Sequence, residues 1–385
     1  MLIYWIWLAT RPGMSEWEKL AVLERFSNPE DIYFATEQSF SSVEGLTKAA
    51  LAALCDKNLD EAQKIAAVCT RKKIRILTWH DAMYPRRLKN IADPPLILYY
   101  KGVLPDLDAN PVIGVVGTRQ ASAYGLNIAG KLSSEIAACG GLVISGMAKG
   151  VDAWATRGAL EAQTTAVGVL GCGVDRVYPA CNAELFRKME RSGCLLSEYP
   201  PGTKPDKWNF PRRNRIISGI SCGVLVVEAP VKSGALITAR QAMEQGRDVF
   251  VVPGNIDVAT CAGSNALLRD GAIAVTSGWD VLSEYESLFP EKIHKAQPKE
   301  KGTSQAGDKK VVDKTAPPPY SDLEINTADL TQDETVVLQH ISGEQMIDTL
   351  IAETGLETAA VLAAVTLLEI KGYVATLPGR RVIRK

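Results

Sequence analysis

Short apolar runs alternate with longer helical stretches through most of this 385-residue chain, and this alternation is what most constrains its fold. The runs occupy residues 74–77, 96–99, 112–116, 142–144, 165–170, 223–227 and 248–252. Parallel strands need a crossover long enough to hold a helix, so the alternation is typical of βαβ units. The sequence therefore predicts an α/β fold with a doubly wound, mostly parallel sheet between residues 71 and 288.

Segments of a different character flank this sheet. Helical periodicity predicts a small helical domain in residues 1–70, with helices near 1–10, 15–26, 29–36, 46–54 and 59–70. A stretch rich in Lys, Pro, Ser and Gly at 289–322 is typical of a flexible linker. Residues 323–385 predict a winged helix, with helices at 332–341, 346–354 and 357–370 and a hairpin of 373–377 with 381–383 around Pro378-Gly379.

Composition excludes several classes of protein. A formal net charge of -1 does not suit a protein that coats duplex DNA through bulk charge, so phosphate binding must come from the local basic patches at 71–75, 204–215 and 380–385. The eight cysteines form no Cys-x-x-Cys pair and three histidines accompany them, which is typical of a reduced cytosolic protein without a metal. The apolar opening at 1–9 is far shorter than the ~20 residues that span a bilayer, so we expect a buried helix there and no membrane partner.

One basic run also carries aromatic side chains. Residues 207–215 read Lys-Trp-Asn-Phe-Pro-Arg-Arg-Asn-Arg. Pro211 suits the first position of a helix, whose opening turn would then hold three arginines beside free N–H groups that favour anions. Single-stranded nucleic acid is commonly held by cations along its backbone and aromatic rings under its bases, each stack contributing about 1–3 kcal/mol. The alternative is a solvated helix start with Phe210 in the core, and this segment alone does not decide between them.

Glycine-containing turns follow several of the predicted strands, at 117–119, 145–152, 171–175, 233–239 and 253–254. Ligands of open α/β folds bind at the carboxyl ends of the strands, where such turns converge. In the first of them, backbone N–H groups, the Arg119 guanidinium and the Ser122 hydroxyl predict a phosphate cradle. For any single turn, the need for tight backbone geometry explains the glycines equally well.

The turns and the basic run form a series of motifs: Gly117-Thr-Arg119, Ser145-Gly-x-Ala-x-Gly150-Val-Asp152, Gly171-x-Gly173-x-Asp175, Tyr178-Pro179, Leu196-Ser-Glu198-Tyr-Pro-Pro-Gly202, Phe210-Pro-Arg-Arg-Asn-Arg215, Ser233-Gly-Ala-Leu-Ile-Thr-Ala239, Pro253-Gly254, Gly263-Ser-Asn265 and Asp270-Gly-Ala272. Together they resemble the DNA-processing protein A family, also called DprA or Smf, of bacterial natural transformation. The resemblance is strong over residues 71–288. The flanking segments agree with the family's helical, SAM-like N-terminal domain and its optional C-terminal winged helix.

The resemblance implies a cytoplasmic, homodimeric protein without a cofactor or turnover. Its extended Rossmann domain would bind single-stranded DNA and help load the RecA-class recombinase onto strands that carry single-strand binding protein. Carried over by position, Arg119 and Lys207 would hold phosphates and Phe210 would stack on a base. The further DNA-binding candidates are Gly117, Ser122, Ser145, Gly146, Lys149, Arg212, Arg213, Asn214, Arg215, Gly234 and Thr238. Thr156 stands where many relatives carry His, which weakens any proposal of acid–base chemistry there.

The main alternative is an enzyme resembling the nucleotide phosphoribohydrolases of cytokinin activation. Those proteins bind nucleoside monophosphates through a Pro-Gly-Gly-x-Gly-Thr-x-x-Glu turn and use the Glu in catalysis. The corresponding turn here is 232–240, and Gln241 stands where the carboxylate would be expected. Glu228 could replace it only by pointing into the pocket, whereas a carboxylate at a strand end more often caps a neighbouring helix.

The predicted winged helix lacks the charge expected for duplex reading. Its third helix, 357–370, contains no Lys or Arg, although such a helix needs cations for phosphate and guanine contacts. The basic residues of this domain lie in the wing and tail, at Arg380, Arg381, Arg384 and Lys385. We therefore expect protein contact or weak backbone binding here, with sequence-specific regulation as a minor alternative.

Overall fold

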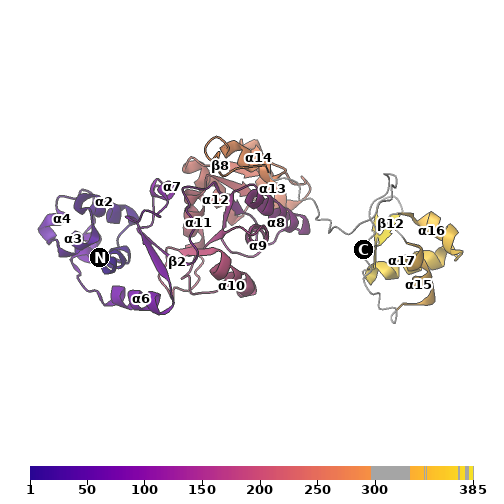
Figure 1. The fold of residues 1–385 in the computed structure, drawn as a ribbon, viewed down its shortest axis with the longest axis horizontal. Coiled ribbons are helices and arrows are strands. Elements are labelled where there is room, and N and C mark those ends of the chain that lie inside the picture. The colour runs from indigo at the N-terminus through magenta and orange to yellow at the C-terminus, as the bar shows by residue number, and fades with distance from the viewer. Residues whose placement is uncertain (296–329, 342, 344, 372, 378–380, 385) are drawn as a thin grey trace, which may run out of the picture. The chain divides into compact units, whose positions relative to one another are not determined.

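The computed structural model describes residues 1–295, 330–341, 343, 345–371, 373–377 and 381–384, and the chain divides into two compact units, Met1–Lys301 and Gly302–Lys385 (Figure 1). Each unit has a hydrophobic core of its own. Most of the stretch predicted to be a linker, from residue 296 onward, lies outside the described residues. The predicted domain boundaries stay a prediction.

The first unit opens with helices α1 Leu2–Ala9, α2 Glu16–Phe26, α3 Pro29–Phe34, α4 Glu37–Phe40, α5 Lys48–Cys55 and α6 Asp60–Arg71. Polar caps explain where several of them begin. Ser15 and Glu18 form a capping box at α2, and Thr47 accepts a hydrogen bond from the Ala50 N–H at α5. Trp5 to Leu8 of α1 are buried, which confirms the expected buried helix at the start of the chain.

A nine-stranded sheet forms the centre of this unit, in the order β1-β2-β6-β5-β4-β3-β7-β8-β9. The strands are β1 Arg75–Thr78, β2 Ile97–Gly102, β3 Val112–Val116, β4 Leu142–Ser145, β5 Ala166–Val169, β6 Cys194–Ser197, β7 Gly223–Val226, β8 Asp248–Val251 and β9 Ile273–Ala274. From β6 to β9 all neighbours are parallel, whereas β2 pairs antiparallel with both β1 and β6. The seven predicted strands are confirmed, and the sequence did not indicate β6 or β9.

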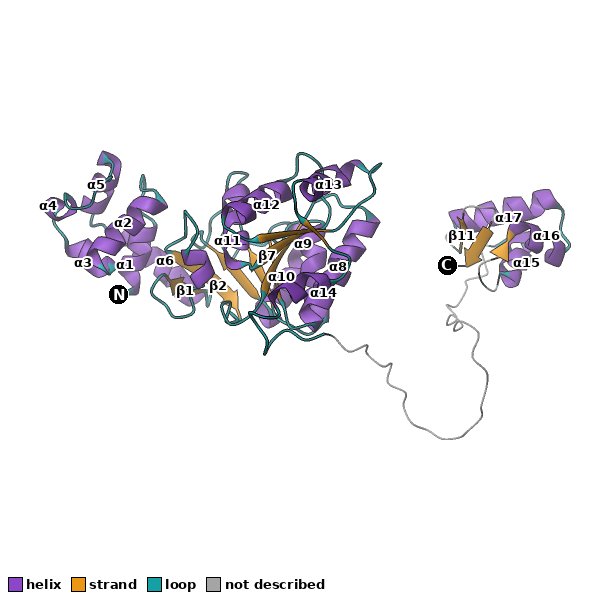
Figure 2. Ribbon diagram, turned by 90° about the horizontal axis from the view of Figure 1, so that it is seen from above, coloured by secondary structure: helices purple, strands orange, loops and turns teal. Residues whose placement is uncertain are grey.

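Helices cover both faces of the sheet. They are α7 Arg86–Lys89, α8 Ala123–Ala138, α9 Val151–Glu161, α10 Ala183–Ser192, α11 Asn209–Ile220, α12 Gly234–Glu244, α13 Ala262–Arg269 and α14 Gly278–Leu282. Ile113 and Val115 of β3 pack into the core under α8, while Val112 and Val116 pack into the core under α11. Figure 2 shows α11 and α12 on one side of the sheet and α8 and α14 on the other. The doubly wound architecture is therefore confirmed.

The second unit contains α15 Gln332–His340, α16 Ile347–Thr354, α17 Thr358–Ile370 and a three-stranded sheet, ordered β10-β12-β11. Its strands are β10 Gln345–Met346, β11 Val374–Leu377 and β12 Arg381–Arg384. This confirms the winged helix and adds one short strand to the predicted hairpin, whose turn at 378–379 lies outside the described residues. Across the described part of the chain, no single helix is long and apolar enough to cross a membrane, and only the sharply bent pair Ile347–Thr354 and Thr358–Glu369 reaches that length and composition.

Candidate nucleic-acid interface

The turns after β3 and β4 pack directly against each other. The Thr118 N–H donates to the carbonyl oxygen of Glu228 at 2.7 Å, which ties the first turn to the end of β7. A Cβ atom on Gly117 would lie 2.5 Å from Val151 Cγ2 at the start of α9. Gly150 has a φ of +78°, and a Cβ atom there would collide with the Thr118 carbonyl. These two positions therefore require glycine, and the close approach positions Arg119.

Arg119, Phe210 and Tyr178 form a stack at this edge of the sheet. The Arg119 Cζ lies 5.3 Å from the centre of the Phe210 ring, and the Tyr178 ring stacks on Phe210 at 5.4 Å between centroids with an interplanar angle of 29°. Phe210 is half-buried, and a Cβ atom on Gly171 would lie 2.9 Å from its Cδ1. The glycine after β5 therefore leaves room for the ring. A cation and two aromatic faces come together from the loops after β3 and β5 and from the first turn of α11.

A cavity of about 640 Å³ lies where the strand order reverses, since β3 has β4 on one side and β7 on the other. Loops after β3, β4, β5 and β7 and the start of α11 line it. A smaller cavity of about 190 Å³ shares Arg119, Ala148, Tyr178 and Phe210 with it. Most of the sequence-predicted residues line one or both of them: Gly117, Arg119, Lys207, Phe210, Arg213, Asn214, Gly234 and Thr238 in the larger, and Gly146 and Lys149 in the smaller.

Two predicted hydroxyl groups are used elsewhere. Ser122 caps α8, accepting from the Gly125 N–H at 3.0 Å and donating to Glu228 Oε2 at 2.9 Å. Ser145 is fully buried and its Oγ donates to the Val115 carbonyl at 2.7 Å. Neither residue lines either cavity. The predicted phosphate cradle therefore lacks the Ser122 hydroxyl, because a tertiary partner 106 residues away engages it.

The basic run differs from its predicted geometry. Helix α11 begins at Asn209, two residues before the predicted start, so Pro211 is its third residue and the arginines lie beyond the first turn. Arg213 is buried and donates to the carbonyl oxygens of Gly146, at 2.6 Å, and Val169. This arginine therefore joins the ends of β4 and β5 to α11 beneath the larger cavity.

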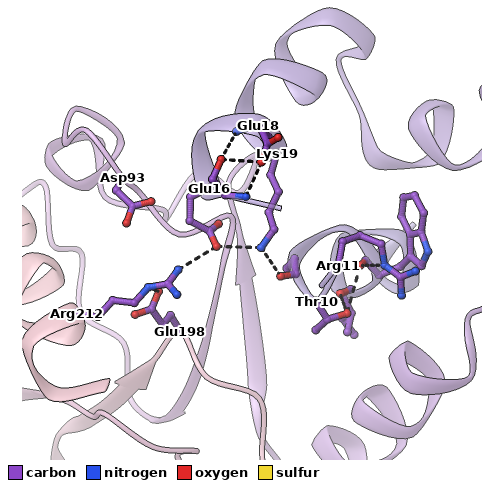
Figure 3. Close-up of polar contacts among 12 residues, drawn as sticks. Thr10, Arg11, Glu16, Glu18, Lys19, Asp93, Glu198 and Arg212 are labelled. Carbon is purple, nitrogen blue, oxygen red and sulfur yellow. Dashed lines mark hydrogen bonds and ion pairs between the residues drawn. The ribbon is translucent and has the colours of Figure 1, made fainter. Parts of the chain in front are cut away.

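Arg212 and Arg215 lie outside both cavities and form ion pairs with Glu16 of α2 and with Glu198. Arg215 Nη2 is 2.7 Å from Glu198 Oε2, and both side chains are buried. Arg212 lies between Glu16 Oε1 at 3.2 Å and Glu198 Oε2 at 3.7 Å (Figure 3). Lys19 approaches the same Glu16 oxygen at 2.9 Å. In this structure Arg212 connects α11 to α2, and Arg215 connects it to Glu198 and Asp93, so neither arginine lines the candidate site.

The floor of the larger cavity holds a buried carboxylate beside the buried Arg213. Burial raises the pKa of Asp152, although Arg213 and the Ala148 N–H partly counter this effect. Burial likewise lowers the pKa of Arg213, against the attraction of Asp152. The exposed cations are at the rim, where Arg119, Lys207 and Lys232 contribute positive charge. An anion is therefore attracted to the rim of the cavity.

Glu228 does not supply an enzyme-like carboxylate to the cavity. Its side chain is 1% exposed and accepts hydrogen bonds from the Ser122 N–H and hydroxyl and from the Thr260 hydroxyl. It lines neither cavity and serves as a cap beside α8, as expected for a carboxylate at a strand end. Among the described residues, no cluster of three His, Cys, Asp or Glu side chains could hold a metal ion.

The lining residues that the sequence-based site did not include contain one aromatic and one cationic side chain. Tyr178 stacks on Phe210, and Lys232 lies on the loop before α12. An aromatic residue within a glycine-rich loop after a strand is a usable signal for the first, because such loops converge on the ligand edge. Apart from its charge, nothing in the sequence pointed to Lys232.

Comparisons with known proteins agree with this architecture. A family model described as DNA recombination-mediator protein A matches residues 75–286, and one described as the DprA winged helix domain matches residues 317–380. DNA processing protein DprA of Bacillus subtilis is 42% identical over 221 residues, which cover 57% of this chain and 74% of that protein. Protein Smf of Synechocystis sp. is 36% identical over 326 residues, covering 82% of this chain and 81% of that protein.

Solved structures give the same result. The X-ray structure of DprA from Streptococcus pneumoniae aligns with a TM-score of 0.66 and 35% identity, covering 74% of this chain and 98% of that one. DprA from Helicobacter pylori, whose structure was described for its single-stranded DNA binding mode, aligns with a TM-score of 0.50 and 28% identity, covering 57% and 98%.

The fold and the cavity define a Rossmann-type α/β protein with a ligand edge at its topological switch point and a separate winged helix. Within that class, the chain belongs to the DprA/Smf family of DNA processing proteins.

Proposed function

We propose that this protein binds single-stranded DNA in the larger cavity and acts as a mediator that delivers the strand to a RecA-class recombinase. The observation that carries the proposal is the stack of Arg119, Phe210 and Tyr178 beside the rim lysines Lys207 and Lys232. Every base has a face that stacks on an aromatic ring, and every nucleotide carries a phosphate for a cation. The arrangement therefore suits a strand of any sequence.

Charge and size favour a polymer over a small nucleotide. A cavity of about 640 Å³ is open at a basic rim, and Trp208, which does not line it, has its ring 5.1 Å from the Nζ of the rim residue Lys207. Trp208 is 74% exposed. Such an exposed ring beside a cation is suited to the next nucleotide of a strand and has no partner in a monophosphate. Backbone contacts of this kind make affinity fall steeply with salt.

The family supports the finer parts of the proposal. The matching family model is described as a recombination mediator, and the Helicobacter pylori relative as a single-stranded DNA-binding protein. We further propose that this protein acts in the cytoplasm, as a homodimer that handles incoming DNA in natural transformation or homologous recombination, with single-strand binding protein as a further partner. In a dimer one strand engages two cavities, which raises the effective concentration for the second contact.

Equilibrium binding of a fluorescent single-stranded oligonucleotide tests the strand-binding part. Unlabelled single strand, duplex of the same sequence and nucleoside monophosphates serve as competitors. We expect the single strand to compete best and the monophosphates to compete only weakly. Competition by a monophosphate as strong as by the strand would contradict the proposal and favour the nucleotide enzyme.

Recombinase assembly tests the mediator part. The readout is the rate at which a RecA-class recombinase forms filaments on a strand already covered by single-strand binding protein. This protein should raise that rate, and Phe210→Ala should remove most of the gain. A rate that is unchanged by the wild-type protein would contradict the mediator role while leaving strand binding intact.

A further inference from the structure

A second basic groove lies away from the cavities described above. It encloses about 400 Å³ between the start of β1 and the end of β2 and is lined by Lys72, Lys73, Arg75, Tyr100, Lys101 and Glu190. Four of these side chains are cationic and one is anionic. The groove coincides with the basic cluster at 71–75, which the proposed function does not use.

The charges of this groove are only partly neutralised. Lys72 Nζ is 2.5 Å from Asp175 Oδ2, and Lys101 Nζ is 2.8 Å from Glu190 Oε1. Within the described residues, Lys73 and Arg75 form no salt bridge, and both are exposed. The groove therefore keeps a net positive charge that an anion can meet.

An aromatic ring accompanies these two cations. The Arg75 Cζ lies 5.9 Å from the centre of the Tyr100 ring. Arg119 and Phe210 have the same relation at 5.3 Å in the larger cavity. A guanidinium above a ring offers both a phosphate contact and a face for a base, whereas a purely ionic cluster offers only the first.

One loop connects the groove to the larger cavity. Asp175, which holds Lys72, also accepts a hydrogen bond from the Gly202 N–H at 2.8 Å. Tyr178, which stacks on Phe210, is three residues further along this loop, so at most about 11 Å of extended chain separates the two. Arg176 lies between them and is exposed. Arg176 therefore adds a positive charge to the loop between Asp175 and Tyr178.

We propose that the groove of Lys73, Arg75 and Tyr100 is a second contact surface for the phosphate backbone of the DNA strand that occupies the larger cavity. This inference rests on the proposed function and extends it. A short strand fills the cavity alone, while a longer strand crosses the loop at Arg176 and reaches the groove.

Two lengths of oligothymidine separate the two surfaces in the full-length protein. One has roughly 6 nucleotides, within the range that a single binding module holds, and the other is about five times as long. Affinity is measured for each against salt concentration. The double variant Lys73→Ala/Arg75→Ala should bind the short strand as the wild type does. For the long strand its log–log salt slope should be shallower by about 0.7 for each phosphate that the variant no longer neutralises.

A matched control removes the same charge elsewhere. Arg25 has its Cζ 5.9 Å from the Phe26 ring, and Lys131 is an exposed lysine on α8. Arg25→Ala/Lys131→Ala should leave both affinities and both slopes as in the wild type. An equal reduction of affinity in this control would overturn the proposal, because bulk charge would then explain the effect.

A variant that is expected to bind the long strand more tightly gives an independent test of the proposal. Glu190→Gln removes the partner of Lys101 and should raise affinity for the long strand and steepen its salt slope, which a folding defect would not do. Wild-type behaviour of both groove variants on the long strand would overturn the proposal. An acidic protein segment would then be the favoured partner of the groove. Failure of the proposed function itself would appear differently, as an absence of short-strand binding in the wild type.

Discussion

Two arginines beside the cavity differ in what surrounds them, and the surroundings decide what each does. Arg213 is 4% exposed and its guanidinium donates to backbone carbonyls of Gly146 and Val169. The hydrogen bonds of this guanidinium join two loops to α11, because a buried cation must have its donors satisfied. Arg119 is exposed above the Phe210 ring and keeps its donors for a ligand.

Gly146 is held between the charged groups of the cavity floor. A Cβ atom there would lie 2.5 Å from Arg213 Nη2 and 2.6 Å from Asp152 Oδ2. Gly146→Ala should therefore lower the free energy of unfolding by about 1–3 kcal/mol, as overpacking does, measured by urea denaturation. Gly234→Ala is the matched control, because its Cβ atom would meet nothing within 4 Å. Equal stability of Gly146→Ala and wild type would contradict the geometry.

Glu18 makes stability depend on pH in the acid range. Burial opposes its charge, but hydrogen bonds from Thr47 and Ser15 outweigh this and lower the pKa of its carboxyl from 4.5 to about 2. A depressed pKa contributes stability that is present above 4.5 and is lost as pH falls toward 2. The unfolding temperature of Glu18→Gln should therefore lie below that of the wild type at pH 6, with the difference shrinking as pH falls. A difference independent of pH would contradict this role.

Single residues of the site were predictable where the local pattern itself carries the chemistry. The glycine turn identified Arg119, and the basic run with its aromatic residues identified Phe210, both of which line the cavities. The pattern failed where a distant partner engages the side chain. Ser122 is taken by Glu228, and Arg215 by Glu198, and neither partner could be read from the neighbouring sequence.

At the scale of elements, α11 is placed by ionic contacts as well as by packing. Ile216, Ile217 and Ile220 enter the core on one face of the sheet, while Arg212 and Arg215 reach Glu16 and Glu198. Figure 3 shows Glu16 between Lys19 and Arg212. Because Phe210 and Arg213 lie on the same helix, these contacts also fix the stacking ring.

The pair of Arg215 and Glu198 offers a test of this anchoring. The two side chains are 8% and 6% exposed, so removing Glu198 leaves the buried Arg215 guanidinium with only the half-exposed Asp93, 3.2 Å from its Nε, as counter-charge. Glu198→Gln should lower the free energy of unfolding by about 3–5 kcal/mol in chemical denaturation. Combining Glu198→Met with Arg215→Met should recover part of this stability, since two apolar groups need no partner. A decrease below ~1 kcal/mol, the range of surface pairs, would show that the pair is not structural.

Elements were predictable when their apolar pattern was long enough. The buried run of β3, flanked by a glycine turn, predicted a strand that the structure confirms. Strand β6 was missed because its four residues, Cys194–Ser197, include no β-branched or aromatic side chain, and β9 has only two residues. The antiparallel pairing of β2 depends on contacts far along the chain, which periodicity does not report.

At the scale of the whole molecule, the chain separates the candidate site from the winged helix. The site lies within Met1–Lys301, which holds its own cores, and the winged helix has a separate one. Helix α17 carries no Lys or Arg. We therefore expect the second unit to contribute protein contacts instead of affinity for the strand.

Truncation checks this division. A protein ending at Lys301 should fold and bind single-stranded DNA nearly as tightly as the full chain, as measured by fluorescence anisotropy. Full-length protein with Arg380, Arg381, Arg384 and Lys385 replaced by Ala should behave in the same way. A large drop in affinity in either protein would mean that the main site was assigned to the wrong unit.

The most direct test of the central claim is the salt dependence of single-strand affinity in the wild type, Arg119→Ala and Phe210→Ala. Arg119→Ala should bind more weakly with a log–log slope shallower by about 0.7, because one phosphate is no longer neutralised. Phe210→Ala should reduce the binding free energy by about 1–3 kcal/mol with its slope unchanged, because a stack carries no counterion. Wild-type affinity and slope in both variants would contradict the account.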